Sequence, residues 1–438
     1  MGEIYDEVRV GDKSYQFPKG KENFTQKMFE YFPDHKEEIK AYLKLIAKAN
    51  RKAQMFFFEK TFKPILAKTI GPLFKKGFQR FAQKSTLDTL KEITDNDELI
   101  AVLCAQCGNY GLSPKYSSFS AHALIVGHFM EGGYYPNGGS ETLAEAAIQK
   151  LNSNQGKVYI NSQVEAINVE NKRVTGVTVN GKFIACKSVI SNVGVLNTNN
   201  HLLKANATII DKQKFGNIKR STGHICLYVG VKGNSHDLGL PKNNIWSFSS
   251  NQYDKIFDAA NLKDAGKDFT YISFPSSKDA LAQNDISTIQ IVTIGRHEWL
   301  EKYENEPWRK RSPEYQKIKD QVSQNLIQAL LKIYPHLEDK IEFHELSTPL
   351  STQHFTQYDK GEIYGLEHSS QRFLLPFLRP ETKIKGLRLA GQDITVVGVA
   401  GAMLSGMLCA ITILKFKVWR VFYKMTKIEI PKNPGDDI

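Results

Sequence analysis

A glycine-rich segment near the C-terminal end of the chain, residues 386–406, constrains the fold more than any other feature. Leu387 to Ala390 form a short apolar run that predicts a buried strand. Gly391 follows where the chain has to turn sharply, and Asp393 then offers a fixed acceptor for a hydroxyl group. This order of strand, glycine and acidic residue indicates a chain that bends closely around a bulky group.

The second half of this segment predicts a helix that starts with bare backbone. Gly398 and Gly401 lie at its start, where free N–H groups and the helix dipole favour a phosphate or the electron-rich edge of a flavin. Ser405 and Cys409 add small residues for close packing. Residues 394–414 contain no charged side chain and are long enough to cross a bilayer, but their glycines dilute the hydrophobicity. We therefore expect a buried helix rather than a membrane span.

A second glycine pair lies within residues 134–147, Tyr-Tyr-Pro-Asn-Gly-Gly-Ser-Glu-Thr-Leu-Ala-Glu-Ala-Ala. Gly138 and Gly139 allow close approach of the backbone to a ligand, and Ser140 is a suitable N-cap for a following helix. The region after it is β-rich, with asparagine turns between short apolar runs. Strands are predicted in the runs 157–160, 164–169, 174–179, 183–185 and 187–192.

Taken in order, these segments are similar to motifs of the phytoene-desaturase superfamily of flavoproteins. Residues 386–406 resemble its C-terminal FAD motif, in which the Asp binds ribityl or pyrophosphate and the following helix points at the flavin. Residues 347–353 and 361–368, followed by Arg372, are similar to the retinol-saturase branch. The resemblance covers nearly all of the 438 residues.

The resemblance implies positions for the cofactor and the substrate. Val164 opens a strand similar to the one whose backbone contacts the adenine, and Ser191 and Asn192 resemble the loop that closes over the nucleotide. His368 is the candidate catalytic residue, with a purely structural histidine as the more common alternative. The implied cofactor-binding residues are Gly138, Gly139, Val164, Gly391, Asp393, Gly398 and Gly401.

The chain also departs from this family. Members begin with a strand, a G-x-G-x-x-G turn and a helix, with an acidic residue for the ribose after the next strand. The sequence contains no such turn. We expect an α/β (mixed α+β) FAD/NAD(P)-binding flavoprotein fold of the phytoene-desaturase/amine-oxidase type, N-terminally truncated, with a mixed substrate-binding domain. We also expect the chain alone to bind FAD poorly.

The flavin-like motifs occur in two blocks far apart in sequence, which predicts a discontinuous FAD domain. The expected organisation is an N-terminal hairpin at 1–20, a helical region facing substrate or membrane at 21–130, FAD-domain parts at 131–205 and 346–414, a substrate domain at 206–345 with a helix near 314–334, and a basic tail at 415–438.

A net charge of +12 calls for an acidic partner or none. No zinc-finger, basic-zipper or RNA-binding aromatic signature is present, which disfavours nucleic acid. Residues 51–84 interleave bulky apolar side chains with nine Lys and Arg against Glu59 alone, a pattern suited to an interfacial helix. We expect peripheral membrane attachment there, helped by Lys415, Lys417, Arg420 and Lys424. The alternative is a solvated basic face over an ordinary core stripe.

Five cysteines, too few and odd in number for a disulfide framework, indicate a reducing, cytosolic-side compartment. Cys104 and Cys107 form a C-x-x-C pair, which cannot complete a tetrahedral zinc site by itself. A redox pair is one interpretation, and two small core residues in a buried helix are the favoured one. His122 and His128 lack a third partner for a metal, and we expect no metal site from the sequence.

The expected function is an FAD-dependent oxidoreductase acting on double bonds of a long conjugated polyene or isoprenoid, with NAD(P)H as a candidate reductant. In the intact family the flavin carries the chemistry and the protein supplies an apolar tunnel. Two alternatives stay open: a non-catalytic lipid-binding remnant of the family, and a carotenoid isomerase.

Overall fold

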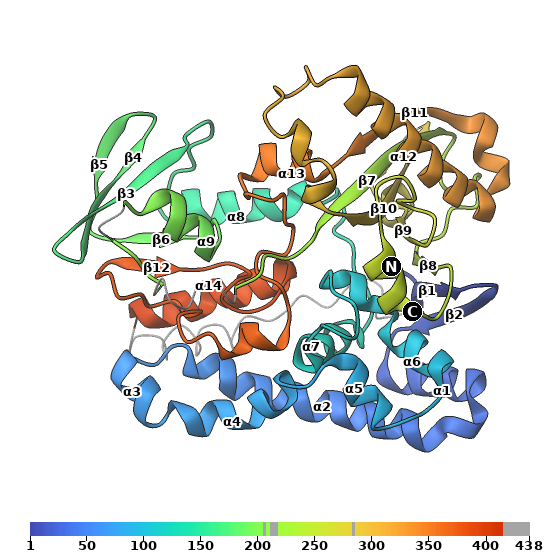
Figure 1. Cartoon of the computed structure of the whole chain (residues 1–438), viewed down its shortest axis with the longest axis horizontal. Coiled ribbons are helices and arrows are strands. Elements are labelled where there is room, and N and C mark those ends of the chain that lie inside the picture. The colour runs from blue at the N-terminus through green and yellow to red at the C-terminus, as the bar shows by residue number, and fades with distance from the viewer. Residues whose placement is uncertain (205–206, 211–217, 283–284, 415–438) are drawn as a thin grey trace. The chain divides into compact units, whose positions relative to one another are not determined.

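The protein is seen here in a computed structural model that describes residues 1–204, 207–210, 218–282 and 285–414 (Figure 1). The chain divides into two compact units. Unit 1 comprises Met1–Gln54, Lys76–Gln163 and Lys212–Leu375, and unit 2 comprises Met55–Lys75, Val164–Asp211 and Pro376–Ile438.

Unit 1 is built on a seven-stranded sheet in the order β11-β7-β10-β9-β8-β1-β2. Only β1 and β8 run parallel, and the other neighbours are antiparallel. Its strands are β1 (Ile4–Val10), β2 (Lys13–Pro18), β7 (Gly223–Lys232), β8 (Asn244–Phe248), β9 (Phe269–Ser273), β10 (Ile286–Gly295) and β11 (Ile341–Ser347).

One long helix, α12 (Pro313–Ile333), completes the core of this sheet. Its residues Val322, Leu326 and Leu330 recur every four positions and are buried, which is the spacing of one helix face. They belong to one apolar cluster with Leu227 of β7 and Ile291 of β10. The helix predicted near 314–334 is therefore present.

The other helices of the chain are α1 (Lys21–Tyr31), α2 (Lys36–Glu59), α3 (Pro64–Thr69), α4 (Gly71–Ala82), α5 (Thr86–Lys91), α6 (Asp97–Cys104), α7 (Phe119–Phe129), α8 (Glu141–Ser153), α9 (Val195–Asn197), α10 (Tyr253–Ala259), α11 (Pro275–Lys278), α13 (Pro349–Thr356) and α14 (Gly398–Leu414). The predicted hairpin at 1–20 and the mostly helical stretch after it are both observed. None of the described helices is long and apolar enough to cross a bilayer, and α14 has only 17 residues.

Unit 2 contains two small sheets. Strands β3 (Val164–Glu170), β4 (Arg173–Val179) and β5 (Lys182–Ala185) form an antiparallel meander. Strands β6 (Val189–Ser191) and β12 (Leu387–Leu389) pair in parallel, although nearly two hundred positions separate them in sequence. The predicted strand after Gly386 is therefore present, and its partner is the strand predicted at 187–192 (Figure 1).

Two local predictions were wrong. Residues 157–160 are not a strand, and Tyr159 and Ile160 are largely exposed. Their alternation is strand-like, but a strand needs a neighbour for its backbone groups, and this run has no ladder partner among the described residues. Ser140 precedes α8 as predicted, but its side chain makes no capping bond because its backbone is helical rather than extended.

Candidate functional site

The glycine-rich segment of unit 2 is organised by the parallel pair β6 and β12. Leu387 pairs with Val189 and Leu389 with Ser191, so the carboxyl ends of both strands reach the same edge. Two loops leave that edge, one toward α9 and one toward α14. In open α/β sheets, ligands bind at this carboxyl edge.

Asp393 ties these two loops together. It is buried, and its Oδ2 accepts a hydrogen bond of 2.8 Å from the backbone N–H of Val195, the first residue of α9. The sequence predicted Asp393 as an acceptor for a ligand hydroxyl. The structure assigns one of its oxygens to the backbone, so any ligand contact has to use the remaining acceptor capacity of the carboxylate.

Gly391 has no room for a side chain. Its φ is +97°, and a Cβ there would lie 2.1 Å from Oδ1 of Asn192. The loop residue Asn192 and the glycine turn, predicted separately from sequence, are therefore in direct contact. Gly401 also has no room for a side chain, since a Cβ there would lie 2.0 Å from the backbone carbonyl oxygen of Val396.

Gly398 differs from both of these glycines. Its φ is +90°, and no atom of the described residues lies within 4 Å of the position that a Cβ would occupy. It begins α14, whose next residue, Val399, is 62% exposed. The start of α14 therefore offers bare backbone N–H groups beside open space, as an anionic or electron-rich ligand group requires.

The remaining predicted cofactor residues are placed as follows. Val164 opens β3 and is 38% exposed, opposite Val179 of β4. Gly138 and Gly139 belong to unit 1 and have φ values of +83° and +81°. The N–H of Gly138 donates to the carboxylate of Asp279 at 2.8 Å. A cofactor role for these residues remains a prediction.

His368 lies in unit 1 and has no exposed surface. Burial, with Arg372 nearby, holds the pKa of its imidazole well below the usual range, so the ring stays neutral. Its backbone carbonyl accepts from the N–H of Ser118. These features favour the structural interpretation, and its catalytic role remains a prediction.

The sequence did not identify an aromatic cavity in unit 1, of about 230 Å³. Strands β7, β8, β9 and β10 supply much of its wall, and two glycines close it from another side. The lining includes Gly108, Gly111, Thr222, His224, Trp246, Phe257, Phe269, Tyr271, Val292, Ile363 and Tyr364.

The two glycines explain how the rings come so close to the backbone. A Cβ at Gly108 would lie 2.5 Å from the indole of Trp246, and one at Gly111 would lie 2.8 Å from the ring of Tyr364. The hydroxyl of Tyr364 donates to the carbonyl of Gly108 at 2.9 Å. Burial raises the pKa of Tyr364 to about 12, so it remains a protonated donor.

His224 places a polar atom in this apolar wall. Burial lowers the pKa of its imidazole, which leaves the ring neutral. Its buried Nδ1 has no hydrogen-bond partner among the described residues. A buried polar atom without a partner carries a free-energy cost, and a ligand group that bonds to it would remove that cost.

A wider and more polar pocket of about 530 Å³ shares five lining residues with the aromatic cavity, including Thr222 and Phe257. Its wall also carries Arg220, Arg296 and Lys360. Unit 1 thus has an apolar cavity next to a polar basin. The sequence offered one signal for the aromatic cavity. Tyr364 falls within residues 361–368, which were noted for their similarity to the retinol-saturase branch.

The sequence profile described as flavin containing amine oxidoreductase matches residues 17–414. The chain belongs to this family. It is 28% identical to an all-trans-retinol 13,14-reductase of Danio rerio over 94% of this chain and 72% of that protein. The human protein of the same name is 30% identical over 92% and 70%. An inactive all-trans-retinol 13,14-reductase of Danio rerio is 27% identical over 92% and 70%.

Solved amine oxidases share the fold. A putrescine oxidase matches with a TM-score of 0.57 and 11% identity, over 94% of this chain and 82% of that one. A cyclohexylamine oxidase from Brevibacterium oxydans matches with a TM-score of 0.55 and 9% identity, over 96% and 82%. The predicted flavoprotein fold of the amine-oxidase type is confirmed.

FAD is the cofactor of this family of flavin-containing oxidoreductases, and the residues of unit 2 fit it in part. The open backbone at Gly398 suits an electron-rich group, and the buried carboxylate of Asp393 suits a hydroxyl. When bound, the flavin supplies hydride transfer. The second helix start that grips the pyrophosphate elsewhere in the family, the one after G-x-G-x-x-G, has no counterpart in this sequence.

Proposed function

We propose that the chain works as an FAD-dependent oxidoreductase on a double bond of a long conjugated polyene or isoprenoid, in the manner of retinol saturation. The aromatic cavity of unit 1 carries this proposal. Flat rings and one neutral imidazole line it, and none of the described residues in its lining is charged. Such a wall suits a hydrophobic chain with a single polar end. The names of the relatives support the same substrate class.

The volumes agree with a ligand of this kind. The aromatic cavity alone, at about 230 Å³, lies below the roughly 300–1,000 Å³ usual for small-molecule sites. The adjoining basin adds about 530 Å³. We infer that the apolar chain enters the aromatic part while a polar end can remain in or near the basin.

The chain's own residues have defined tasks in this scheme. Trp246, Phe269 and Tyr271 bury and orient the polyene by contact with its faces. His224 offers its free Nδ1 to a hydroxyl group of the substrate. The protonated hydroxyl of Tyr271, whose pKa burial raises strongly, remains a neutral group at the wall. The pocket also keeps water from the reacting carbons.

A binding experiment tests the proposal. All-trans-retinol is titrated into the protein, and quenching of tryptophan fluorescence is measured for the wild type, Phe269→Ala and Phe257→Ala. We expect each variant to bind at least about tenfold more weakly, because a large part of the apolar contact is lost. Phe343→Ala is the matched control, since Phe343 is 54% exposed on β11 and does not line the cavity. Equal affinity in all four proteins would rule out this cavity as the site.

Two alternatives concern the outcome of the reaction rather than the site. A non-catalytic binding protein is the first alternative, and the existence of an inactive relative favours it. It would bind the polyene without flavin-dependent turnover. A carotenoid isomerase would return a product with the same number of double bonds, whereas a reductase would return one fewer. Product mass separates these two, and turnover that depends on added NAD(P)H would identify the reductant.

We also propose that the protein attaches peripherally to lipid through α3 and its flanks. In unit 2, several large apolar side chains of this stretch lie exposed together with the cations of Lys63 and Lys68. Interfacial segments combine these two features. The exposed apolar residues are Met55, Phe58, Ile65, Leu66, Ile70 and Leu73.

The structure sharpens the choice of residues for testing this attachment. Lys60 is buried and donates to the carbonyl of Leu378, and Lys75 pairs with Glu59 at 3.5 Å, so neither is a free surface cation. Lys68 is exposed and suits charge reversal. The cations expected to help from the basic tail, residues 415–438, lie outside the described residues.

Co-sedimentation with phosphatidylserine vesicles tests the attachment. Leu73→Ser and Lys68→Glu should both weaken binding, the second by on the order of 1 kcal/mol per cation near the surface, and added salt should weaken it further. Leu281→Ser removes another exposed leucine, in unit 1 and 66% exposed against 80% for Leu73, and should change nothing. Vesicle binding that is unchanged by Leu73→Ser, by Lys68→Glu and by added salt would overturn this mode of attachment.

A further inference from the structure

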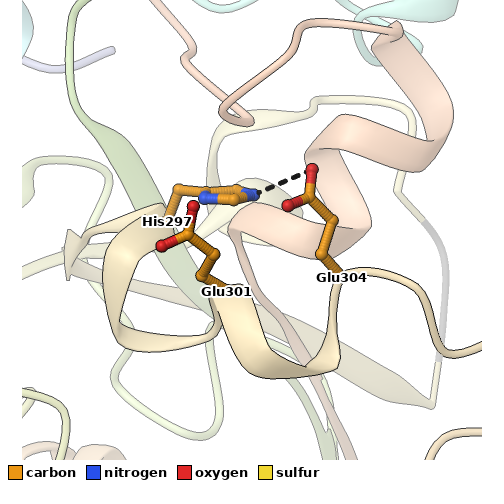
Figure 2. A group of neighbouring side chains, drawn as sticks. All are labelled: His297, Glu301 and Glu304. Atoms are coloured by element: carbon orange, nitrogen blue, oxygen red, sulfur yellow. Dashed lines mark ion pairs between the residues drawn. The ribbon is translucent and has the colours of Figure 1, made fainter.

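We propose that His297, Glu301 and Glu304 form a binding site for a divalent transition-metal ion, of which Zn²⁺ is the best fit. The three residues lie on two consecutive turns of 3₁₀-helix in unit 1, His297–Trp299 and Glu301–Tyr303, and on the residue that follows. Figure 2 shows the two carboxylates flanking the imidazole ring. One ligand atom from each residue lies within 4.8 Å of the others, a grouping found at no other place in the described part of the chain.

The state of His297 points to a ligand. The residue is 2% exposed, yet neither Nδ1 nor Nε2 forms a hydrogen bond with any described residue, and the nearest carboxylate, that of Glu304, is an ion-pair contact at 3.6 Å. Buried histidines normally have partners, and His122 of this protein shows the usual case. Its Nε2 lies 2.9 Å from the hydroxyl of Tyr42, and its Nδ1 lies 3.3 Å from the hydroxyl of Tyr110. Leaving both nitrogens of a buried ring without a partner is costly, and a metal ion at one of them would offset that cost.

The two carboxylates supply the charge that a cation needs. Glu304 Oε1 lies 3.6 Å from His297 Nε2, too far for a hydrogen bond but close enough for an ion to lie between them. Tetrahedral zinc, with bonds of about 2.0–2.2 Å, holds its ligand atoms roughly 3.3 Å apart. The observed separations, all within 4.8 Å, therefore require movements of about an ångström or so by exposed or half-buried glutamates.

Two neighbours define how the carboxylates are held. The side-chain amide of Gln353 donates to Glu304 Oε1 at 2.7 Å and to the backbone carbonyl of Asp359 at 3.0 Å. Such a bond orients a ligating carboxylate from behind. Lys360 donates to Glu301 Oε1 at 3.1 Å, and its side chain is 39% exposed. Its ammonium competes with a cation for Glu301, and it can withdraw into solvent when the ion enters.

The donor set selects the class of ion. One imidazole nitrogen and two carboxylate oxygens suit zinc or manganese better than soft, thiolate-seeking ions, and they leave a position for water. The ion also has a route of entry, since His297 and Lys360 line the polar basin of unit 1. A bound ion would fix the 3₁₀ turns that form part of the basin wall. Zinc binding at this site requires neither the flavin nor the substrate, so it can be tested without them.

The experiment uses the untagged full-length chain, freed of metal with a chelator and titrated with Zn²⁺ in competition with a chromophoric chelator. We expect one tight site in the wild type, and affinity losses greater than about 100-fold in Glu301→Gln and Glu304→Gln, which keep the shape of each side chain. Gln353→Ala should lose about 10–100-fold, as outer-shell partners do. Glu298→Gln is the matched control, because Glu298 is exposed in the same segment but lies outside the cluster.

Two further measurements keep the result decisive. X-ray absorption at the zinc edge should show nitrogen and oxygen scatterers and no sulfur. Far-UV circular dichroism of the metal-free variants should match that of the wild type, so that a loss of binding is not a loss of fold. The proposal is overturned if the folded wild type takes up no stoichiometric zinc, if Glu301→Gln and Glu304→Gln bind as tightly as Glu298→Gln, or if sulfur ligands appear.

Discussion

The sheets of the two units cover their apolar side chains to very different extents. In unit 1, Leu227 and Ile291 are completely buried between the seven-stranded sheet and α12. In unit 2, Phe183 of β5 is 59% exposed, Ile190 of β6 is 52% exposed and Met403 of α14 is 71% exposed. A wide sheet with a helix on it closes its own core, whereas the two- and three-stranded sheets of unit 2 have too few neighbours to do so.

This difference bears on the cofactor. The glycine turn, Asp393 and the start of α14 are in place in unit 2, but they stand on the two-stranded sheet of β6 and β12. The Gly-rich helix start that would offer a second contact to the pyrophosphate is not found in this sequence. The aromatic cavity, which we propose as the substrate site, has its walls on the large sheet of unit 1.

The largest expected effect concerns flavin content. We predict that the chain as given binds FAD poorly, and that fusing a strand, a G-x-G-x-x-G turn and a helix upstream raises flavin to near one per protein. Each hydrogen bond to a charged phosphate is worth about 1.5–3 kcal/mol, so two or three of them change affinity by several powers of ten. Visible flavin absorbance per mole of protein is the measurement. Stoichiometric FAD in the unextended chain would contradict the prediction.

The next effect concerns the two cores. Ile291→Ala in unit 1 should lower the free energy of unfolding by about 2–5 kcal/mol, because it leaves a cavity in a closed core. Met403→Ala in unit 2 should change it by no more than about 0.5 kcal/mol, as for most surface positions. Denaturant unfolding followed by far-UV circular dichroism measures both. Equal losses would show that Met403 is covered in solution.

A third effect depends on pH and belongs to unit 1. Burial raises the pKa of Asp6 to about 6, while hydrogen bonds from Gln106 and Asn244 oppose the shift. In the unfolded chain the same carboxyl titrates near 3.8, so it loses its proton first there. The carboxyl of Asp6 therefore adds its full contribution to the free energy of unfolding below about pH 4, and that contribution is lost as the pH rises from about 4 to about 6.

Asp6→Asn tests this contribution. The variant should gain stability relative to the wild type as the pH rises through that window, by on the order of 1–3 kcal/mol. Lys278 lies nearby, and burial lowers its pKa to about 8, so the comparison belongs below pH 7, where Lys278 is charged. Unfolding at pH 4 and at pH 6.5 gives the difference. An unchanged or reversed difference would show that Asp6 is not titrating as a buried group.

The smallest effect is a chemical contrast between the units. Cys104 and Cys107 of unit 1 are completely buried, and burial raises the pKa of each thiol, so they should resist alkylation. Cys186 of unit 2 is partly exposed and should react. Mass spectrometry after brief treatment with iodoacetamide measures each site. Rapid labelling of the C-x-x-C pair would revive the redox interpretation, which the burial of both sulfurs now disfavours.

Local sequence was a good guide wherever neighbours in the chain decide the conformation. The hairpin at 1–20, the helix near 314–334 and the turn at Gly391 each follow from residues within about one or two helical turns of one another. Residues 157–160 show the limit. Their pattern is strand-like, but whether a strand forms depends on a partner elsewhere in the chain.

The sequence by itself determined the family and its flavin cofactor, because these depend on short segments whose residues act together. Only the tertiary structure revealed the aromatic cavity and the cluster at His297. The cavity joins residues from β7, β8, β9 and β10 with Gly108 and Tyr364, and His297 gains meaning only when neither nitrogen of its buried ring is seen to form a hydrogen bond with the described residues. Periodicity says which residues are buried, whereas the order of strands in the sheet decides which of them meet.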